Sequence, residues 1–226
     1  MKMDETSIRI EKLFDLHQTI ARFIFSGKTY PWEVLNDISA FILELGKSLG
    51  KEYERIAEDI WIGQGAQIEK TAIIKGPAII GKSCEIRHAA FIRGNVIIGD
   101  NSVVGNSTEI KNSLLFNSVQ VPHFNYVGDS IIGYKAHLGA GVILSNVKSD
   151  KKSIKVKIAK DQFVESGLRK FGAMIGDNVE VGCNSVLNPG TIIGRNSRIY
   201  PLTSVRGVIS ENCIVKSTGE IVEIEI

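Results

Sequence analysis

The feature that most constrains this chain is an aliphatic residue that recurs every six positions. A first run comprises Ile62, Ile68, Ile74, Ile80, Ile86, Ile92, Ile98, Val104 and Ile110. After an interruption, a second run comprises Ile175, Val181, Leu187, Ile193, Ile199 and Val205. An amphipathic helix would repeat at three and four residues, and a half-buried strand at two. A period of six therefore indicates a short strand followed by a turn, repeated many times.

The residue two positions before each aliphatic is small or β-branched, as at Ala66, Cys84 and Ser102. Glycine or asparagine commonly follows and supplies the backbone freedom that a corner needs. Three such strands complete a triangular coil of about 18 residues, and the coils stack at the strand spacing. The pattern predicts an all-β parallel β-helix. It also places Cys84 inside, as a packed structural thiol.

Four segments follow from where the period holds and fails. Residues 1–58 show helical spacing in two stretches separated by Pro31, so we expect an N-terminal helical hairpin that caps the solenoid or packs on its neighbour. Residues 59–146 and 173–226 form the two parts of the β-helix, the second with a C-terminal tail. Residues 147–172 form a basic loop or arm, which is either a solvated excursion or an anion-binding lid.

Composition excludes some partners. The net charge is +2, so it gives no case for nucleic acid, and no apolar stretch has the length of a signal peptide or a membrane span. The three cysteines show no metal-ligand spacing. We therefore expect a cytoplasmic protein with no metal site, no nucleic-acid partner and no membrane partner.

Two basic residues mark a candidate anion site. Arg93 and Lys111 are 18 residues apart, one full coil, and should stack about 5 Å apart. With no acid in register between them, a mere charge ladder would suffer repulsion, whereas a phosphate would bridge both cations. The pair therefore predicts a phosphate-binding site.

His123 lies where the period slips, since the aliphatic series runs from Ile110 to Val121. A break in packing could redirect this imidazole into a cleft, where it could take a proton from an amine attacking a thioester. On composition alone, a structural histidine is equally well supported. Lys111 and His123 are two-thirds of a coil apart, so they should occupy different corners. Either the slip or a neighbouring subunit must then bring them to one site.

The segments 91–95, 108–112, 121–129 and 137–141 resemble a known family. They are similar to the acetyltransferase domain of the bifunctional enzyme that acetylates glucosamine 1-phosphate and then makes UDP-N-acetylglucosamine. They are closer still to archaeal sugar-1-phosphate nucleotidylyltransferases/acetyltransferases and to short UDP-N-acetylglucosamine pyrophosphorylase-related proteins. The similarity covers roughly residues 60–210. It implies a left-handed β-helix, a homotrimer and acetyl-CoA as co-substrate.

The resemblance also implies roles for individual residues. Arg93 and Lys111 match the phosphate-contacting pair, and His123 matches the general base. Ala140 matches the position whose backbone N–H faces the acetyl-CoA thioester. With Ala140, Cys183 is assigned to acetyl-CoA binding. The remaining substrate-binding positions are Tyr126, His137, Asn146, Lys152 and Lys155.

The chain also departs from the family. His137 stands where an asparagine is usual, and Val147 where the bacterial enzyme has tyrosine. Residues 1–58 are too short for the nucleotidyltransferase domain, so we expect uridylyl transfer to need another chain.

The leading hypothesis is N-acetylation of an amino-sugar 1-phosphate, a small sugar phosphate, in nucleotide-sugar synthesis. The alternatives are a non-catalytic nucleotide-sugar-binding or regulatory subunit, and a solenoid acyltransferase with another acceptor.

Overall fold

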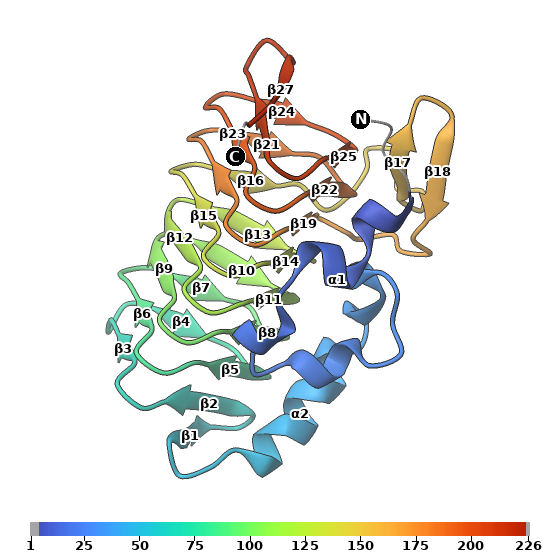
Figure 1. Cartoon of the computed structure of the whole chain (residues 1–226). Coiled ribbons are helices and arrows are strands. Elements are labelled where there is room, and N and C mark those ends of the chain that lie inside the picture. The colour runs from blue at the N-terminus through green and yellow to red at the C-terminus, as the bar shows by residue number, and fades with distance from the viewer. Residues whose placement is uncertain (1–4, 225–226) are drawn as a thin grey trace.

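The computed structural model describes residues 5–224, and its main body is a β-helix with three sheets (Figure 1). Sheet A contains, in order, β1 (Tyr53–Ala57), β2 (Ile60–Gly63), β5 (Ala78–Ile80), β8 (Val96–Ile98), β11 (Ser113–Leu115), β14 (Ile131–Ile132), β19 (Ala173–Ile175), β22 (Thr191–Ile193) and β25 (Val208–Ile209). Sheet B contains β3 (Gln67–Ile68), β6 (Glu85–Ile86), β9 (Val103–Asn106), β12 (Gln120–His123), β15 (His137–Leu138), β20 (Glu180–Val181), β23 (Arg198–Ile199), β26 (Cys213–Val215) and β27 (Ile221–Glu223). Sheet C contains β4 (Ile73–Ile74), β7 (Phe91–Ile92), β10 (Glu109–Lys111), β13 (Tyr126–Gly128), β16 (Ile143–Leu144), β21 (Val186–Leu187) and β24 (Ser204–Val205).

The recurring aliphatic residues form the inner ladders of these sheets. In sheet C, for example, Ile74 lies beside Ile92, and Ile92 beside Ile110. From Ala78 onward the small residues two positions before them are also buried, and burial raises the pKa of the Cys84 thiol to about 12. The predicted fold class, an all-β left-handed parallel β-helix, is confirmed.

The sequence suggested that the slip in the period is a break in packing at His123, but the structure shows no such break. Val121 stays in register with Val104, and it is buried. The chain instead loses one residue at the turn from sheet C to sheet A, which we name the C/A corner, in two successive coils. The shortened corners lie between Ile110 and Leu115 and between Val127 and Ile132. His123 therefore owes its position to an ordinary corner between sheets B and C, the B/C corner.

The N-terminal segment differs from the expected helical hairpin. Only α2 (Ile38–Ser48) is a long helix, and β1 already begins within the range 1–58. The other elements are short: η1 (Glu5–Ile8), α1 (Ile10–Leu13), η2 (Leu16–Gln18), η3 (Arg22–Phe25) and η4 (Pro31–Val34). The reason is that the backbone of this stretch bonds to the solenoid. Asp177 N–H donates to the Leu13 carbonyl and Asn117 N–H to the Gln18 carbonyl, in place of a continuous helical ladder.

This segment lies along the side of the solenoid, over sheet A, and does not cover its end (Figure 1). Sheet A alone carries a column of buried outward-facing aliphatics, namely Ile79, Ile97, Leu114, Ile131, Met174 and Ile192. Removing this column from water stabilises the fold, at about 1.5–3 kcal/mol for each side chain. The rings of Phe14 and Phe116 pack 5.1 Å apart at this contact.

At each end of the solenoid, one of the three sheets finishes in a strand that runs against the others. β1 pairs antiparallel with β2, and β27 pairs antiparallel with β26. Every other pair in sheets A, B and C is parallel. Among residues 5–224, no helix is long and apolar enough to cross a bilayer.

The basic segment after Asn146 is an ordered arm. It contains the antiparallel hairpin of β17 (Lys155–Ala159) and β18 (Gln162–Glu165). Val156 and Ile158 on one face are buried, and the lysines on the other face are exposed. The arm leaves and rejoins the solenoid at the C/A corner, where the two preceding coils are shortened.

Candidate functional site

Arg93 and Lys111 stack as the sequence predicted. Ile92 and Ile110 are partners in the parallel ladder, so the residues that follow them occupy equivalent positions in successive coils. Both side chains extend from the C/A corner, in the column that continues to Gly128.

No acid lies in register between the two stacked cations, but each of them pairs with an acid from another position. The Arg93 guanidinium lies 2.6 Å from a carboxylate oxygen of Glu109, and the Lys111 ammonium lies 3.2 Å from Asp129. Glu109 precedes Lys111 by two residues on the same outer face of β10 and reaches down to Arg93. Asp129 sits one coil above Lys111, at the second shortened corner. Each cation is thus held in place by an acid, and its other N–H donors stay available.

Asp129 is the centre of this cluster. Its side chain is 5% exposed, and it accepts hydrogen bonds from Lys111, from Asn112 and from Asn146. A buried carboxylate requires such donors, because burial without them would cost several kcal/mol. Asn146, at the start of the arm, is thereby fixed beside the two stacked cations. Sequence reasoning missed Asp129, and the only signal for it was the shortened spacing from Val127 to Ile132.

Tyr126 lies over the backbone of the same strand. A methyl group placed at Gly128 would come within 2.6 Å of the Tyr126 hydroxyl and 2.8 Å of Asn146 Nδ2. Burial, then Asp129 and Glu109, raise the pKa of the Tyr126 phenol above its ordinary value. The hydroxyl therefore stays protonated and able to donate. The structure thus groups Arg93, Lys111, Tyr126 and Asn146, and adds Gly128 as the residue that leaves room for them.

His123 lies at the opposite edge of sheet C, at the B/C corner. Its imidazole is exposed, and its carbonyl accepts a hydrogen bond from the N–H of Gly141 in the coil above. This places His123 directly beside the turn that contains Ala140. The prediction that Lys111 and His123 occupy different corners is confirmed, since β13 separates them.

The Ala140 turn presents an unused donor. The N–H groups of Gly139 and Gly141 donate to the carbonyls of Val181 and His123, whereas no described residue accepts from the N–H of Ala140. Cys183 lies one coil further along the same corner, with an exposed side chain. His123, Ala140 and Cys183 are thus three successive positions on one edge of the molecule.

Three predicted residues lie apart from both groups. His137 is on the outer face of sheet B, between Gln120 and Glu180, and does not enter the cluster at Asp129. Lys155 forms an ion pair with Glu165 across the arm hairpin, at 2.5 Å. Lys152 is exposed, and its backbone N–H donates to Asp150. Neither lysine contacts Arg93 or Lys111.

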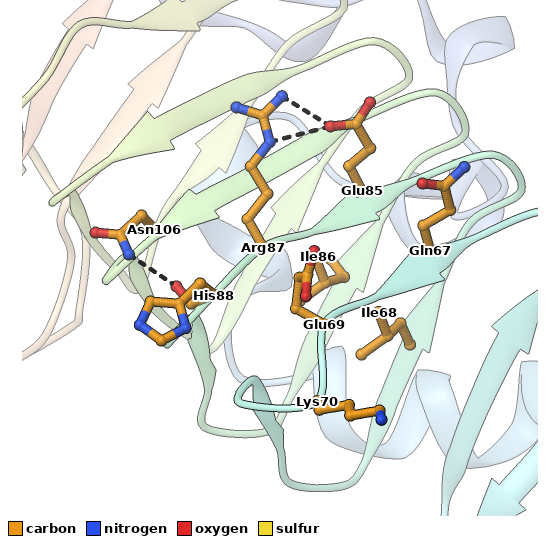
Figure 2. Close-up of a pocket in the computed structure, with 9 residues that line it drawn as sticks. All are labelled: Gln67, Ile68, Glu69, Lys70, Glu85, Ile86, Arg87, His88 and Asn106. Atoms are coloured by element: carbon orange, nitrogen blue, oxygen red, sulfur yellow. Dashed lines mark hydrogen bonds and ion pairs between the residues drawn. The ribbon is translucent and has the colours of Figure 1, made fainter.

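A polar hollow adjoins the B/C corner below His123 (Figure 2). Asn106, the ladder partner of His123, donates from its side chain to the carbonyl of His88. The His88 ring is 2.7 Å from the Thr71 hydroxyl. His88 therefore occupies, two coils down, the position in the corner that His123 occupies above. No cluster of metal-binding residues is found within residues 5–224.

Comparisons with known proteins agree with the repeat pattern. Residues 74–164 match the GMPPB C-terminal domain, and residues 172–207 match the bacterial transferase hexapeptide (six repeats). A bifunctional protein GlmU of Methanococcus maripaludis strain C7 is 44% identical over 199 residues, covering 85% of this chain and 47% of that protein. The GlmU of strain S2 is 34% identical over 224 residues, covering 96% and 54%.

Two further similarities are narrower. A bifunctional sugar-1-phosphate nucleotidylyltransferase/acetyltransferase of Sulfurisphaera tokodaii is 42% identical over 97 residues, 43% of this chain and 24% of that protein. The solved structure of PerB from Caulobacter crescentus, in complex with CoA and GDP-perosamine, is 14% identical with a TM-score of 0.44, covering 70% and 56%. The chain spans about half the length, or less, of the curated relatives that it matches. The resemblance stated from the sequence motifs is confirmed.

Proposed function

Because this chain belongs to the hexapeptide-repeat transferases, similar to GlmU proteins over most of its length, we propose that it transfers an acetyl group from acetyl-CoA to an amino-sugar 1-phosphate in nucleotide-sugar synthesis. The observation that carries the proposal is the hydrogen bond from the Gly141 N–H to the His123 carbonyl. It sets His123, whose side chain is exposed, in the coil next to the turn that carries the unused N–H of Ala140. A general base next to an oxyanion donor is the arrangement that acyl transfer needs.

The chemistry at this corner follows from those two groups. The amine nitrogen of the acceptor attacks the thioester carbonyl while His123 takes its proton. The developing oxyanion accepts a hydrogen bond from the Ala140 N–H, and the C–S bond breaks to release the thiolate of CoA, which takes up a proton. Cys183, one coil above and exposed, would contact the bound CoA.

The acceptor would lie across the outer face of sheet C. The N–H groups of Arg93 and Lys111 that Glu109 and Asp129 leave unused would bind its phosphate. Tyr126 and Asn146 would contact the sugar. β13 is three residues long, about 10 Å at the rise of a strand, so the ligand and the long basic side chains must together span the face of the sheet.

A second copy of the chain would complete the site. Sheet A is covered by the chain's own N-terminal segment, but sheet C and the B/C corner expose large apolar side chains. The exposed fractions are 57% for Ile73, 59% for Phe124, 36% for Val186 and 74% for Leu202. A homotrimer with sheet C at the contact would bury them and turn an open face into a cleft.

The test measures thiol release from acetyl-CoA with glucosamine 1-phosphate as acceptor. We expect turnover by the wild type and a loss of at least a hundredfold in kcat for His123→Ala. His88→Ala is the matched control, since this histidine lies in the same column of corners, and it should retain turnover. Turnover with a different amine or hydroxyl acceptor would support the other-acceptor alternative. Binding of nucleotide sugars without turnover of any acceptor would support the non-catalytic one.

A further inference from the structure

The arm and the last coils form a basic cleft whose function the proposed acetyl transfer leaves unassigned. It is lined by Lys148, Lys155, Lys157 and Phe163 from the arm and by Arg206 from the solenoid, with Gly207 beside it. No carboxylate lines it. It lies on the C/A corner, five coil steps beyond Arg93 in the same column, about 24 Å at the strand spacing.

Close backbone packing holds this cleft in shape. Gly207 has a φ of +83°, and a methyl group there would lie 3.0 Å from the Lys157 carbonyl and 3.7 Å from its Cβ. At Gly190, with a φ of +79°, a methyl group would come within 2.7 Å of Ile154. Two glycines therefore let β17 rest directly on successive corners. Burial of Ile154, Val156 and Ile158 fixes the backbone from which the exposed lysines extend.

The charges in the cleft are not balanced. Lys155 pairs with Glu165 and Lys148 with Asp150. Within residues 5–224, no ion pair joins Lys157 or Arg206 to a carboxylate, and the Arg206 guanidinium donates to the neutral amide of Asn188. Lys157 is adjacent to Arg206 through the Gly207 contact. Two cations without acidic partners, as the sequence suggested for Arg93 and Lys111, thus line the cleft between the arm and the last coils.

An aromatic ring completes the cleft. Phe163 lies opposite Lys157 across the arm hairpin and is 50% exposed. At the neighbouring cross-strand position, Lys155 faces Glu165. Lys157 instead faces the ring of Phe163, which cannot neutralise its charge. An exposed ring beside two unpaired cations suits a ligand with a phosphate and a planar base.

We propose that Lys157 and Arg206 form a second anion site, which binds a phosphate of a nucleotide while Phe163 packs against its base. The nucleotide is either the adenosine bisphosphate end of CoA, in which case the site rests on the proposed function, or a separate nucleoside diphosphate. The binding itself is independent of acyl transfer.

The experiment is isothermal titration of the full chain with adenosine 3′,5′-bisphosphate, with UDP and with pyrophosphate. We expect the wild type to bind at least one nucleotide. Lys157→Gln/Arg206→Gln should weaken that binding at least tenfold, and Phe163→Ala should weaken nucleotide binding more than pyrophosphate binding. The matched control is Lys160→Gln/Lys170→Gln, which removes two exposed arm lysines outside the cleft and should leave the affinity within twofold. Preference for the bisphosphate assigns the site to CoA, and preference for UDP assigns it to a separate nucleotide.

The proposal is overturned if the wild type binds none of the probes, or if the double variant, folded by circular dichroism, binds as tightly as the wild type. These titrations contain no acyl donor, so their failure is distinguishable from the failure of His123-dependent turnover.

Discussion

The ammonium of Lys111 lies 3.2 Å from the carboxylate of Asp129, at the corner where two successive coils are each one residue short. Asn112 and Asp129 both have a positive φ there, 45° and 50°. The tight turn buries the carboxylate one coil above Lys111, in contact with its ammonium and with the Asn146 amide. The one-residue shortening of the repeat thus positions Asp129 at the centre of the polar cluster.

Removing the Asp129 carboxylate should lower both the stability of the fold and the affinity for the acceptor. We expect Asp129→Ala to lower the free energy of unfolding by about 3 kcal/mol, because it leaves three donors without their acceptor. It should also raise the KM for the sugar phosphate. Urea denaturation and steady-state kinetics measure the two effects. Asp150→Ala, on an exposed pair, is the control and should change the stability by less than about 0.5 kcal/mol.

Adding one methyl group at Gly128 should separate binding from folding. Gly128→Ala would push aside the ends of Tyr126 and Asn146, two side chains that can move, so we expect about a tenfold rise in the acceptor KM. Thermal unfolding should shift by only a few degrees. Gly50→Ala meets no atom within 4 Å and serves as the control. An unchanged KM would remove Tyr126 and Asn146 from the acceptor site.

The junction between the N-terminal segment and the solenoid should depend on pH. Burial raises the pKa of the Asp177 carboxyl above its ordinary value of 3.8, although this group accepts N–H bonds from Asp15 and Tyr134. The folded state therefore binds this proton more tightly than the unfolded state, and protonation of Asp177 stabilises the folded state at pH values below the ordinary pKa. That stabilisation is lost as the pH rises through the raised pKa of the folded state.

The unfolding free energy of the wild type should therefore fall, relative to that of Asp177→Asn, between about pH 3.5 and neutrality. Denaturant titrations of both proteins across that range measure the difference. Parallel curves would show that the charge of Asp177 does not influence the junction.

The N-terminal segment should contribute to the stability of the whole chain. Phe14 is 2% exposed against Phe116, whereas Phe23 is 65% exposed. We expect Phe14→Ala to cost about 3–4 kcal/mol and Phe23→Ala to lie within about 0.5 kcal/mol of the wild type. Equilibrium unfolding of the two variants gives a matched comparison. Equal effects would argue against the packing on sheet A.

Assembly should depend on the apolar edge of sheet C. Leu202→Asp places a charge where a trimer contact is proposed, and we expect the sedimentation coefficient to fall toward that of a monomer, with turnover lost in parallel. Phe23→Asp, at another exposed phenylalanine, should sediment as the wild type does. A monomeric wild type with full turnover would refute the shared site.

The repeat made the fold predictable, because a period of six admits few other architectures. It also predicted the stacking of Arg93 on Lys111, since 18 residues separate them. The acids beside them were harder to foresee, because Glu109 reaches across to the coil below and Asp129 follows a shortened turn. The cover over sheet A did have a signal in the sequence, namely the aliphatic residues at Ile79 and its outward-facing equivalents.

The antiparallel strands at the two ends have a consequence for the behaviour of the protein in concentrated solution. A stack of parallel coils is a template on which another copy could add, coil upon coil, to grow a fibre. β1 and β27 run the wrong way for such addition on one sheet at each end, and β1 carries exposed charged side chains. On these two sheets, the pairing of a further parallel coil is therefore disfavoured.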